Sequence, residues 1–150
     1  MSTWQEIEKD APKFAERVRE RFAAGIHKTI ATLRADGSPR ISGSELKIAD
    51  GEVTFGMMAG SLKLADLRRD NRMAVHSPTI DPPKDGVWLG DAKLAGRAIK
   101  TAPPVEGAQP DGNYFRLDIT EVVLTYVGTP ADHLVIETWH EDKGYRRRKR

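Results

Sequence analysis

The first part of the chain carries a helical pattern of apolar positions. Phe14, Val18 and Phe22 recur every four residues, which places them on one face of a helix. We therefore predict a helical lead over residues 1–24 whose apolar face packs against a sheet.

Proline divides this lead into two predicted helices. Pro12 would kink a continuous helix, because it lacks the N–H group that the helix interior requires. Thr3, with Glu6 three residues later, has the spacing of a capping box, and Asp10 is suited to cap a second helix.

From His27 onward the pattern changes to short runs with strand-like alternation. Asp36-Gly37 and Asp50-Gly51 join the first three runs, and such dipeptides are typical of β-hairpin turns. Seven strands are predicted: residues 27–35, 39–49, 52–58, 72–77, 87–101, 113–128 and 133–141.

One of the long strands changes its pattern midway. Its apolar residues first fall on odd positions (Phe115, Leu117 and Ile119) and then on even ones (Val122 and Leu124). An extra residue in the strand produces such a shift, so we predict a β-bulge near residues 120–121.

The number of strands indicates a mainly β protein. Gly90 and Gly96 interrupt a long strand, as in strands that curve around a barrel. We predict an antiparallel β-barrel of six to seven strands, closed or split, with one short helix inserted at residues 61–70.

Composition narrows the class of protein. The 150 residues suit one domain over 1–150, and 39% hydrophobic with 31% charged residues is typical of a globular chain. Without cysteine there is neither a disulfide nor a cysteine-ligated metal. No apolar run reaches the roughly 18 residues of a membrane span, and no signal peptide is evident, so a cytoplasmic location is expected.

Charge is distributed unevenly along the chain. Residues 143–150 hold six cations and no acid, whereas the rest of the chain has 18 cations and 22 acids. A body with that balance is not a nucleic-acid platform, so nucleic acid is not an expected partner of the whole chain. The basic tail alone is expected to be a solvated end, or to bind nucleic acid or a phosphate.

Residues 50–77 predict an anion site. Ser61 stands where the inserted helix begins, and Lys63 follows within its first turn. A helix start offers unpaired N–H groups and the positive end of the helix dipole, which suits a phosphate. Met57 and Met58 precede this helix on a strand and point to opposite faces, so one of them faces a ligand or a partner.

Motifs for other chemistry are absent. The four histidines, His27, His76, His133 and His140, lack metal-ligand spacing, so no metal site is predicted. Neither a G-x-S-x-G nucleophile motif nor a P-loop occurs, and no catalytic residue is assigned.

Several passages together resemble a known family. They are ATLRADGSPRIS, the strand GEVTFGMM with the following GSLKLADLRRDNRMAV, YFRLDITEV, and HLVIETWHEDKG. In order and spacing they are similar to the pyridoxamine 5′-phosphate oxidase-like proteins, a flavin-binding split-barrel family. The resemblance covers roughly residues 25–150 and is nearest to the actinobacterial branch, whose members bind flavin mononucleotide (FMN) or the deazaflavin F420.

This resemblance implies a split barrel that forms a homodimer with its cofactors at the interface. The implied cofactor-binding residues are Arg40 and Ser42 on the second strand, Met57 and Met58 at the end of the third, Ser61 and Lys63 at the helix start, and Trp139 on the last strand, reaching the other subunit's cofactor.

Two positions depart from the true oxidases. Glu45 and Leu62 stand where those enzymes carry further basic residues, and their C-terminal substrate signature is missing. Vitamin B6 chemistry is therefore not assigned. The resemblance instead implies an FMN-dependent oxidoreductase of unknown substrate.

Three other hypotheses stay open. An F420-dependent reductase would use Arg40, Lys63, Arg68 and Arg69 as a groove for the acidic tail of that cofactor. A non-enzymatic flavin or small-ligand binder, or a barrel used only for assembly, would need no substrate-recognition residue. Nucleic-acid binding would rest on the basic tail alone.

Overall fold

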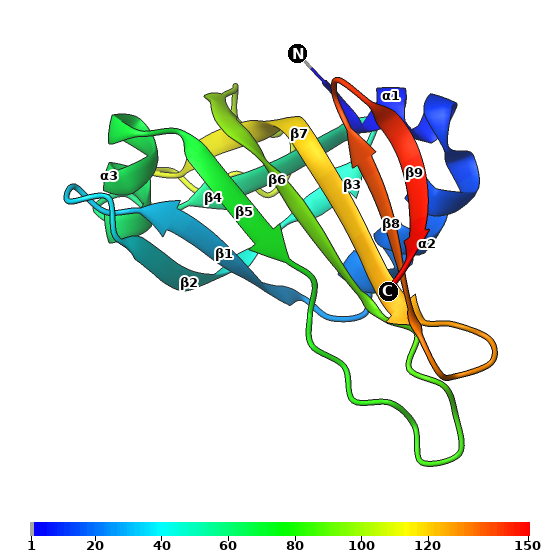
Figure 1. The fold of residues 1–150 in the computed structure, drawn as a ribbon. Coiled ribbons are helices and arrows are strands. Elements are labelled where there is room, and N and C mark those ends of the chain that lie inside the picture. Colours follow the sequence, from blue (N-terminus) through cyan, green and yellow to red (C-terminus); the bar gives the residue numbers. More distant parts are fainter. Residues whose placement is uncertain (1) are drawn as a thin grey trace.

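The computed structural model describes residues 2–150 and has mainly β structure, as predicted (Figure 1). The element order is α1 (Trp4–Asp10), α2 (Pro12–Ala23), β1 (His27–Leu33), β2 (Pro39–Glu45), β3 (Lys47–Ala49), β4 (Glu52–Met57), α3 (Leu62–Arg69), β5 (Arg72–His76), β6 (Asp91–Lys100), β7 (Asn113–Val127), β8 (Leu134–His140) and β9 (Gly144–Lys149).

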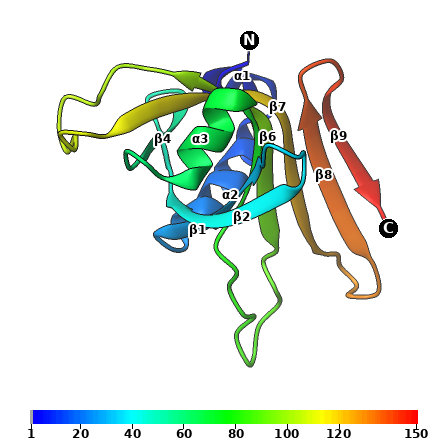
Figure 2. The same cartoon turned by 90° about the vertical axis from the view of Figure 1, so that its left-hand side faces the viewer.

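The strands form one antiparallel sheet in the order β2-β1-β5-β6-β7-β4-β3, with β8 added to β7 and β9 added to β8. Strand β7 explains how the sheet divides. Its first residues, from Asn113 to Arg116, pair with β4, and its last residues, from Glu121 to Val127, pair with β8. The barrel and the β8–β9 ribbon therefore part along β7, and Figure 2 shows this ribbon beside the barrel.

Residues 2–150 form two more strands than the sequence predicted. The predicted strand 39–49 divides at Leu46 into β2, which pairs with β1, and β3, which pairs with β4. The prediction that residues 143–150 form a tail beyond the last strand is also wrong in part, because Gly144–Lys149 pairs along β8 as a strand. Gly144 has a φ of 68°, which allows the tight turn between β8 and β9.

The bulge in β7 is confirmed. Ala95 of β6 is opposite Glu121, and the next residue, Gly96, is opposite Ile119, so Thr120 is left out of the register. The Thr120 hydroxyl donates to the Ala95 carbonyl at 3.1 Å. Both predicted Asp-Gly turns are present as well, and Asp50 and Gly51 have the positive φ angles of a tight hairpin turn.

Two short helices replace one long one, as Pro12 predicts, but their predicted caps are wrong. Thr3 makes no side-chain cap, and the N-cap position of α2 is Ala11. The Asp10 carboxylate instead accepts a hydrogen bond from the Trp139 indole at 3.1 Å.

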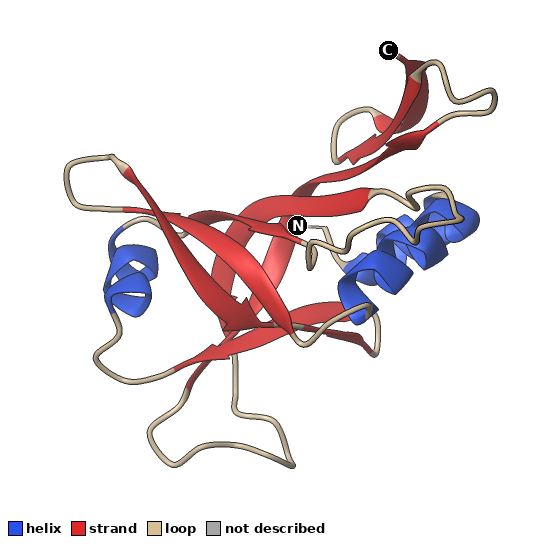
Figure 3. Ribbon diagram, turned by 90° about the horizontal axis from the view of Figure 1, so that it is seen from below, coloured by secondary structure: helices blue, strands red, loops and turns tan. Residues whose placement is uncertain are grey.

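The helices cover the sheet at separate places. Figure 3 shows α3 at one end of the barrel and the α1–α2 pair near the other. α2 contacts β6 and β7, and its predicted stripe of Phe14, Val18 and Phe22 is buried in the core. Within residues 2–150, no helix has the length and apolar character to cross a lipid bilayer.

Candidate functional site

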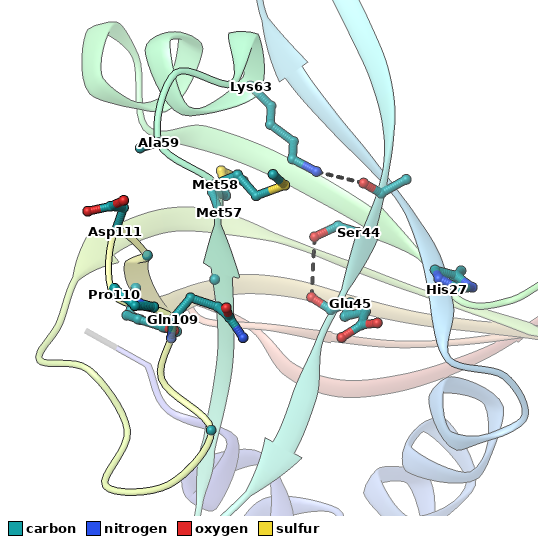
Figure 4. A pocket seen from close by; sticks show the side chains of 15 residues that line it. His27, Ser44, Glu45, Met57, Met58, Ala59, Lys63, Gln109, Pro110 and Asp111 are labelled. Atoms are coloured by element: carbon teal, nitrogen blue, oxygen red, sulfur yellow. Dashed lines mark hydrogen bonds between the residues drawn. The ribbon is translucent and has the colours of Figure 1, made fainter.

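A cleft of about 750 Å³ opens where the barrel is left unclosed (Figure 4). Strand β2 pairs with β1 alone, and β3 pairs with β4 only through Glu52, Val53 and Thr54. The end of β4 and the end of β2 therefore face each other without pairing. Residues 43–45, 56–59, 107 and 109–112 are among those that line the cleft. Its volume suits a small molecule or a cofactor.

The start of α3 lies over this cleft. Ser61 is the N-cap, as predicted, and its hydroxyl accepts from the Leu64 N–H at 3.3 Å. The N–H groups of Leu62 and Lys63 have no hydrogen-bond acceptor in the described chain, as expected of a first helical turn. An anion at this end of the cleft would meet two free donors.

Lys63 crosses the cleft. Its Nζ donates to the Gly43 carbonyl at 2.7 Å, so the side chain links α3 to the edge of β2 (Figure 4). This contact is exposed and satisfies only one of three ammonium donors. The remaining donors are available to a ligand beside the helix start.

Met57 is the last residue of β4 and Met58 follows it, and the two side chains differ in burial, as the predicted opposite orientations imply. The Met57 side chain is buried in the core, whereas 81% of the Met58 surface is exposed. Both residues line the cleft. An exposed thioether at the cleft gives a planar apolar ligand a surface to lie on.

Three titratable side chains that were not among the predicted site residues also line the cleft. His27 and Glu45 are cross-strand partners at the ends of β1 and β2, and Asp111 comes from the loop before β7. Pairing the residues of the two strands one by one, outward from the Asp36-Gly37 hairpin turn, would have placed His27 opposite Glu45. No sequence signal placed the loop with Asp111 at the cleft.

The loop before β7 is held by a local contact. The Tyr114 hydroxyl accepts from the Gln109 N–H at 2.6 Å, and both residues line the cleft. This bond fixes one wall of the cleft across from β2 (Figure 4).

Arg40 and Ser42 are not brought to the cleft. The Arg40 Nε and the Thr32 hydroxyl both donate to the buried Asp66 Oδ2 at 2.7 Å, and the hydrogen bond from Arg40 lowers the pKa of this carboxyl. Arg40 therefore joins β2 to α3. Ser42 is half-buried and does not line the cleft.

Trp139 lies in the core, away from any surface. Only 3% of its surface is exposed, and its indole N–H donates to Asp10. The side chain packs within the core of its own chain and is held by Asp10 of α1, so its reach to a second subunit's cofactor stays a prediction. Of the seven predicted residues, Met57, Met58 and Lys63 line the cleft and Ser61 borders it.

A second cleft holds two of the four cations that the F420 hypothesis assigned to one groove. Arg68, Arg69 and Lys100 line a separate space of about 480 Å³ with Asn71 and Asn113. The Arg68 guanidinium donates to the Asn113 side chain at 3.0 Å. Arg40 and Lys63 belong to neither wall of this space, so the four cations do not form one groove.

No protein-family model and no curated protein sequence matches the chain, whereas solved structures do. A pyridoxamine 5′-phosphate oxidase-related, FMN-binding protein from Nostoc punctiforme PCC 73102 is similar with a TM-score of 0.65 at 8% identity, over 93% of this chain and 95% of that one. An F420 reductase has a TM-score of 0.56 at 13% identity, over 69% of this chain and 94% of that one.

A third similar structure is the protein Atu2129, of unknown function, from Agrobacterium tumefaciens str. C58. Its TM-score is 0.58 at 20% identity, over 76% of this chain, which spans only 56% of that protein's chain. At these identities the likeness concerns the fold. The chain has the fold of the pyridoxamine 5′-phosphate oxidase-like split barrels, as the sequence resemblance implied.

Proposed function

We propose that this chain binds FMN in the cleft between β2 and β4 and acts as an oxidoreductase on a small molecule. The observation that carries the proposal is the combination of a lysine and a helix start at one end of this cleft with an exposed methionine beside them. The fold, which FMN-binding and F420-related proteins share, supports the same class of ligand.

The residues present fit such a cofactor. The N–H groups of Leu62 and Lys63 and the Lys63 ammonium would hold the phosphate, because a helix start stabilises negative charge. A side chain added at Gly43 would meet no atom within 4 Å, so the backbone of β2 is open to a flat ring. Met58, which follows β4, would cover the ring.

The flavin would supply the hydride or electron transfer, which explains why the cleft needs no dedicated nucleophile. The chain's own residues would bind and orient. Lys63 would fix the phosphate end, and the loop anchored by Tyr114 would shield the other side from water. His27 and Glu45 would contact the substrate at the mouth of the cleft.

F420 is the second candidate cofactor, favoured by one observation. The separate cleft with Arg68, Arg69 and Lys100 would suit an acidic polyglutamate tail.

We also propose that the cleft is completed by a second copy of the chain. Ile41, on β2, and Leu62, on α3, are exposed apolar side chains, as is Met58, which follows β4 and lines the cleft. Burial of such a patch would stabilise a homodimer. Sedimentation should give twice the mass of the chain, and Ile41→Lys together with Leu62→Lys should shift it to monomer.

The function is tested by titration of the purified protein with FMN and with F420, following tryptophan fluorescence. Binding of FMN with a Kd in the micromolar range or tighter is expected, and failure to bind either cofactor would exclude the proposal. Reoxidation of the photoreduced complex by a substrate, faster than that of free flavin, would separate an enzyme from a non-enzymatic binder.

A further inference from the structure

Strand β9 is an edge of the sheet that carries an unbroken row of cations. Arg146, Arg147, Arg148, Lys149 and Arg150 follow one another, and all of them are exposed. Strand β8 is the single strand partner of β9 in the described chain. Figure 1 shows β9 in red at the outer side of the ribbon.

This row is held in a fixed geometry. Six residues of β9 are in register with β8, from His140 opposite Gly144 to Val135 opposite Lys149. The Tyr145 hydroxyl donates to the buried Glu137 carboxylate, and its ring lies 5.3 Å from that of Phe14. The cations are therefore presented by an ordered strand, so a ligand does not have to order them.

The backbone of β9 offers free hydrogen-bonding groups on its outer side. Leu134 and Arg150 exchange both backbone hydrogen bonds, at 3.0 and 2.8 Å. Antiparallel pairs alternate, so Arg146 and Arg148 also face β8, whereas Tyr145, Arg147 and Lys149 turn their N–H and C=O groups outward. This edge can accept another extended strand.

The cations are also available. Among residues 2–150, none of the five at 146–150 forms an ion pair with an acid of the chain. Because side chains alternate along a strand, Arg147 and Lys149 point to the face of Glu137, and Arg146 and Arg148 point to the opposite face. A strand added at this edge would meet positive charge on both of its faces.

We propose that the free edge of β9 is a docking strip for an extended acidic segment of another protein, which adds to the sheet as a further strand. Backbone hydrogen bonds to Arg147 and Lys149 would provide affinity, and carboxylates beside the arginines would provide selectivity. This inference does not depend on the proposed cofactor, because no residue of the strip lines the cleft.

Two other partners fit less well. A second copy paired through β9 would place arginine and lysine opposite one another, and like charges opposite each other destabilise a sheet. Single-stranded nucleic acid needs aromatic side chains for base stacking, whereas the Tyr145 ring already packs on Phe14. The remainder of the chain, with 18 cations and 22 acids, also lacks a wider basic surface.

The test uses a fluorescein-labelled peptide of ten residues in which glutamate and valine alternate, followed by fluorescence anisotropy at low salt. The full chain should bind this peptide. The same peptide N-methylated at every residue should bind at least about tenfold more weakly, because it keeps its carboxylates but cannot donate backbone hydrogen bonds. Equal binding of the two peptides would exclude strand addition.

Variants locate the site. Arg147→Glu with Lys149→Glu should weaken peptide binding about tenfold or more, since the charge at both positions, and with it the local electrostatic field, changes sign. Lys13→Glu with Lys84→Glu changes the net charge equally at exposed positions elsewhere and should leave binding within about twofold.

Besides equal binding of the two peptides, three results would overturn the proposal: no binding of the glutamate–valine peptide, equal losses in both double variants, or tighter binding of a ten-nucleotide oligothymidine than of the peptide. The first would mean that the cations only protect the edge from self-pairing. Circular dichroism of each variant would verify that β structure is retained.

Discussion

One buried carboxylate, that of Glu137, joins three elements to β8. Only 1% of the Glu137 surface is exposed, and the Arg17 guanidinium of α2 donates to its two oxygens at 2.5 and 2.7 Å. The hydroxyls of Tyr126 on β7 and Tyr145 on β9 donate as well. Burial acts to raise the pKa of Glu137, but these hydrogen bonds, led by that from Arg17, outweigh it and lower the pKa.

Substitution of the two partners of this ion pair should lower the free energy of unfolding by different amounts. Arg17→Met should lower the free energy of unfolding by about 3 kcal/mol, because it leaves a buried charge without its cation. Glu137→Gln should cost less, about 1–2 kcal/mol, since Arg17 has 42% of its side chain exposed and can be hydrated. Urea denaturation at pH 7 measures both. Equal losses would mean that the pair acts only through packing.

Lys63 is the residue on which the proposed phosphate site depends. Lys63→Ala should weaken FMN binding by about 1–3 kcal/mol, the range for a charged hydrogen-bond partner. It should hardly change stability, because the bond from Lys63 to Gly43 is exposed. Isothermal titration with Lys84→Ala, an exposed loop lysine, as the control would measure this. Unchanged affinity in Lys63→Ala would place the phosphate elsewhere.

Strands β6 and β7 lie so close together at the bulge that one position of β6 has no room for a side chain. A Cβ added at Gly96 would lie 2.0 Å from the Asp118 carbonyl oxygen, which belongs to the backbone and cannot move aside. Gly43, on the open edge of β2, has no such neighbour within 4 Å. Glycine is therefore required in one strand and optional in the other.

Gly96→Ala should lower the free energy of unfolding by about 3 kcal/mol or more, because the bulge would have to rearrange. Gly43→Ala should change it by less than about 1 kcal/mol, the ordinary range for an exposed site. Thermal and urea unfolding of the two variants give the comparison. A tolerated Gly96→Ala would show that the register of β6 and β7 can shift without cost.

At the scale of the whole molecule, groups that titrate in acid and groups that titrate in alkali limit the pH range over which the folded state is stable. The hydrogen bond from Arg40 lowers the pKa of Asp66, and the pKa of Glu137 is lowered too. Burial, together with the hydrogen bond to Glu137, raises the pKa of Tyr145 to about 12. The folded state therefore holds its protons less tightly in acid and more tightly in alkali than the unfolded chain does.

The sign of each shift gives the pH profile. The contribution of Asp66 and Glu137 is present above about pH 4, where unfolded carboxyls are ionised, and is lost as the pH falls through their lowered pKa values. The contribution of Tyr145 is present below about pH 10 and is lost as the pH rises toward 12. Unfolding should be hardest on the plateau between these limits.

Urea denaturation across the pH range tests this profile. Asp66→Asn should flatten the acid slope, and Tyr145→Phe should flatten the alkaline slope, because each removes one titrating group. Slopes identical to those of the parent protein would assign the pH dependence to other groups.

Much of the β structure could be predicted from local patterns. The Asp-Gly turns, the alternation of apolar residues and the parity change at Thr120 each depend on a few neighbouring residues. Strand β9 could not be predicted, because five consecutive cations show no alternation and their pairing depends on β8. The site was predicted in part: Ser61 and Lys63 follow from the helix start, whereas Asp111 and His27 come from distant segments.

By itself the sequence determined a mainly β chain, two short leading helices, a bulged long strand and a helix start with a lysine. These follow from steric preferences and periodicity over short distances. Only the tertiary structure decided where the barrel stays open, that Arg40 is tied to Asp66, and that Trp139 is buried against Asp10. The reason is that the unpaired edges and the covered faces depend on how the whole sheet closes, which no single segment specifies.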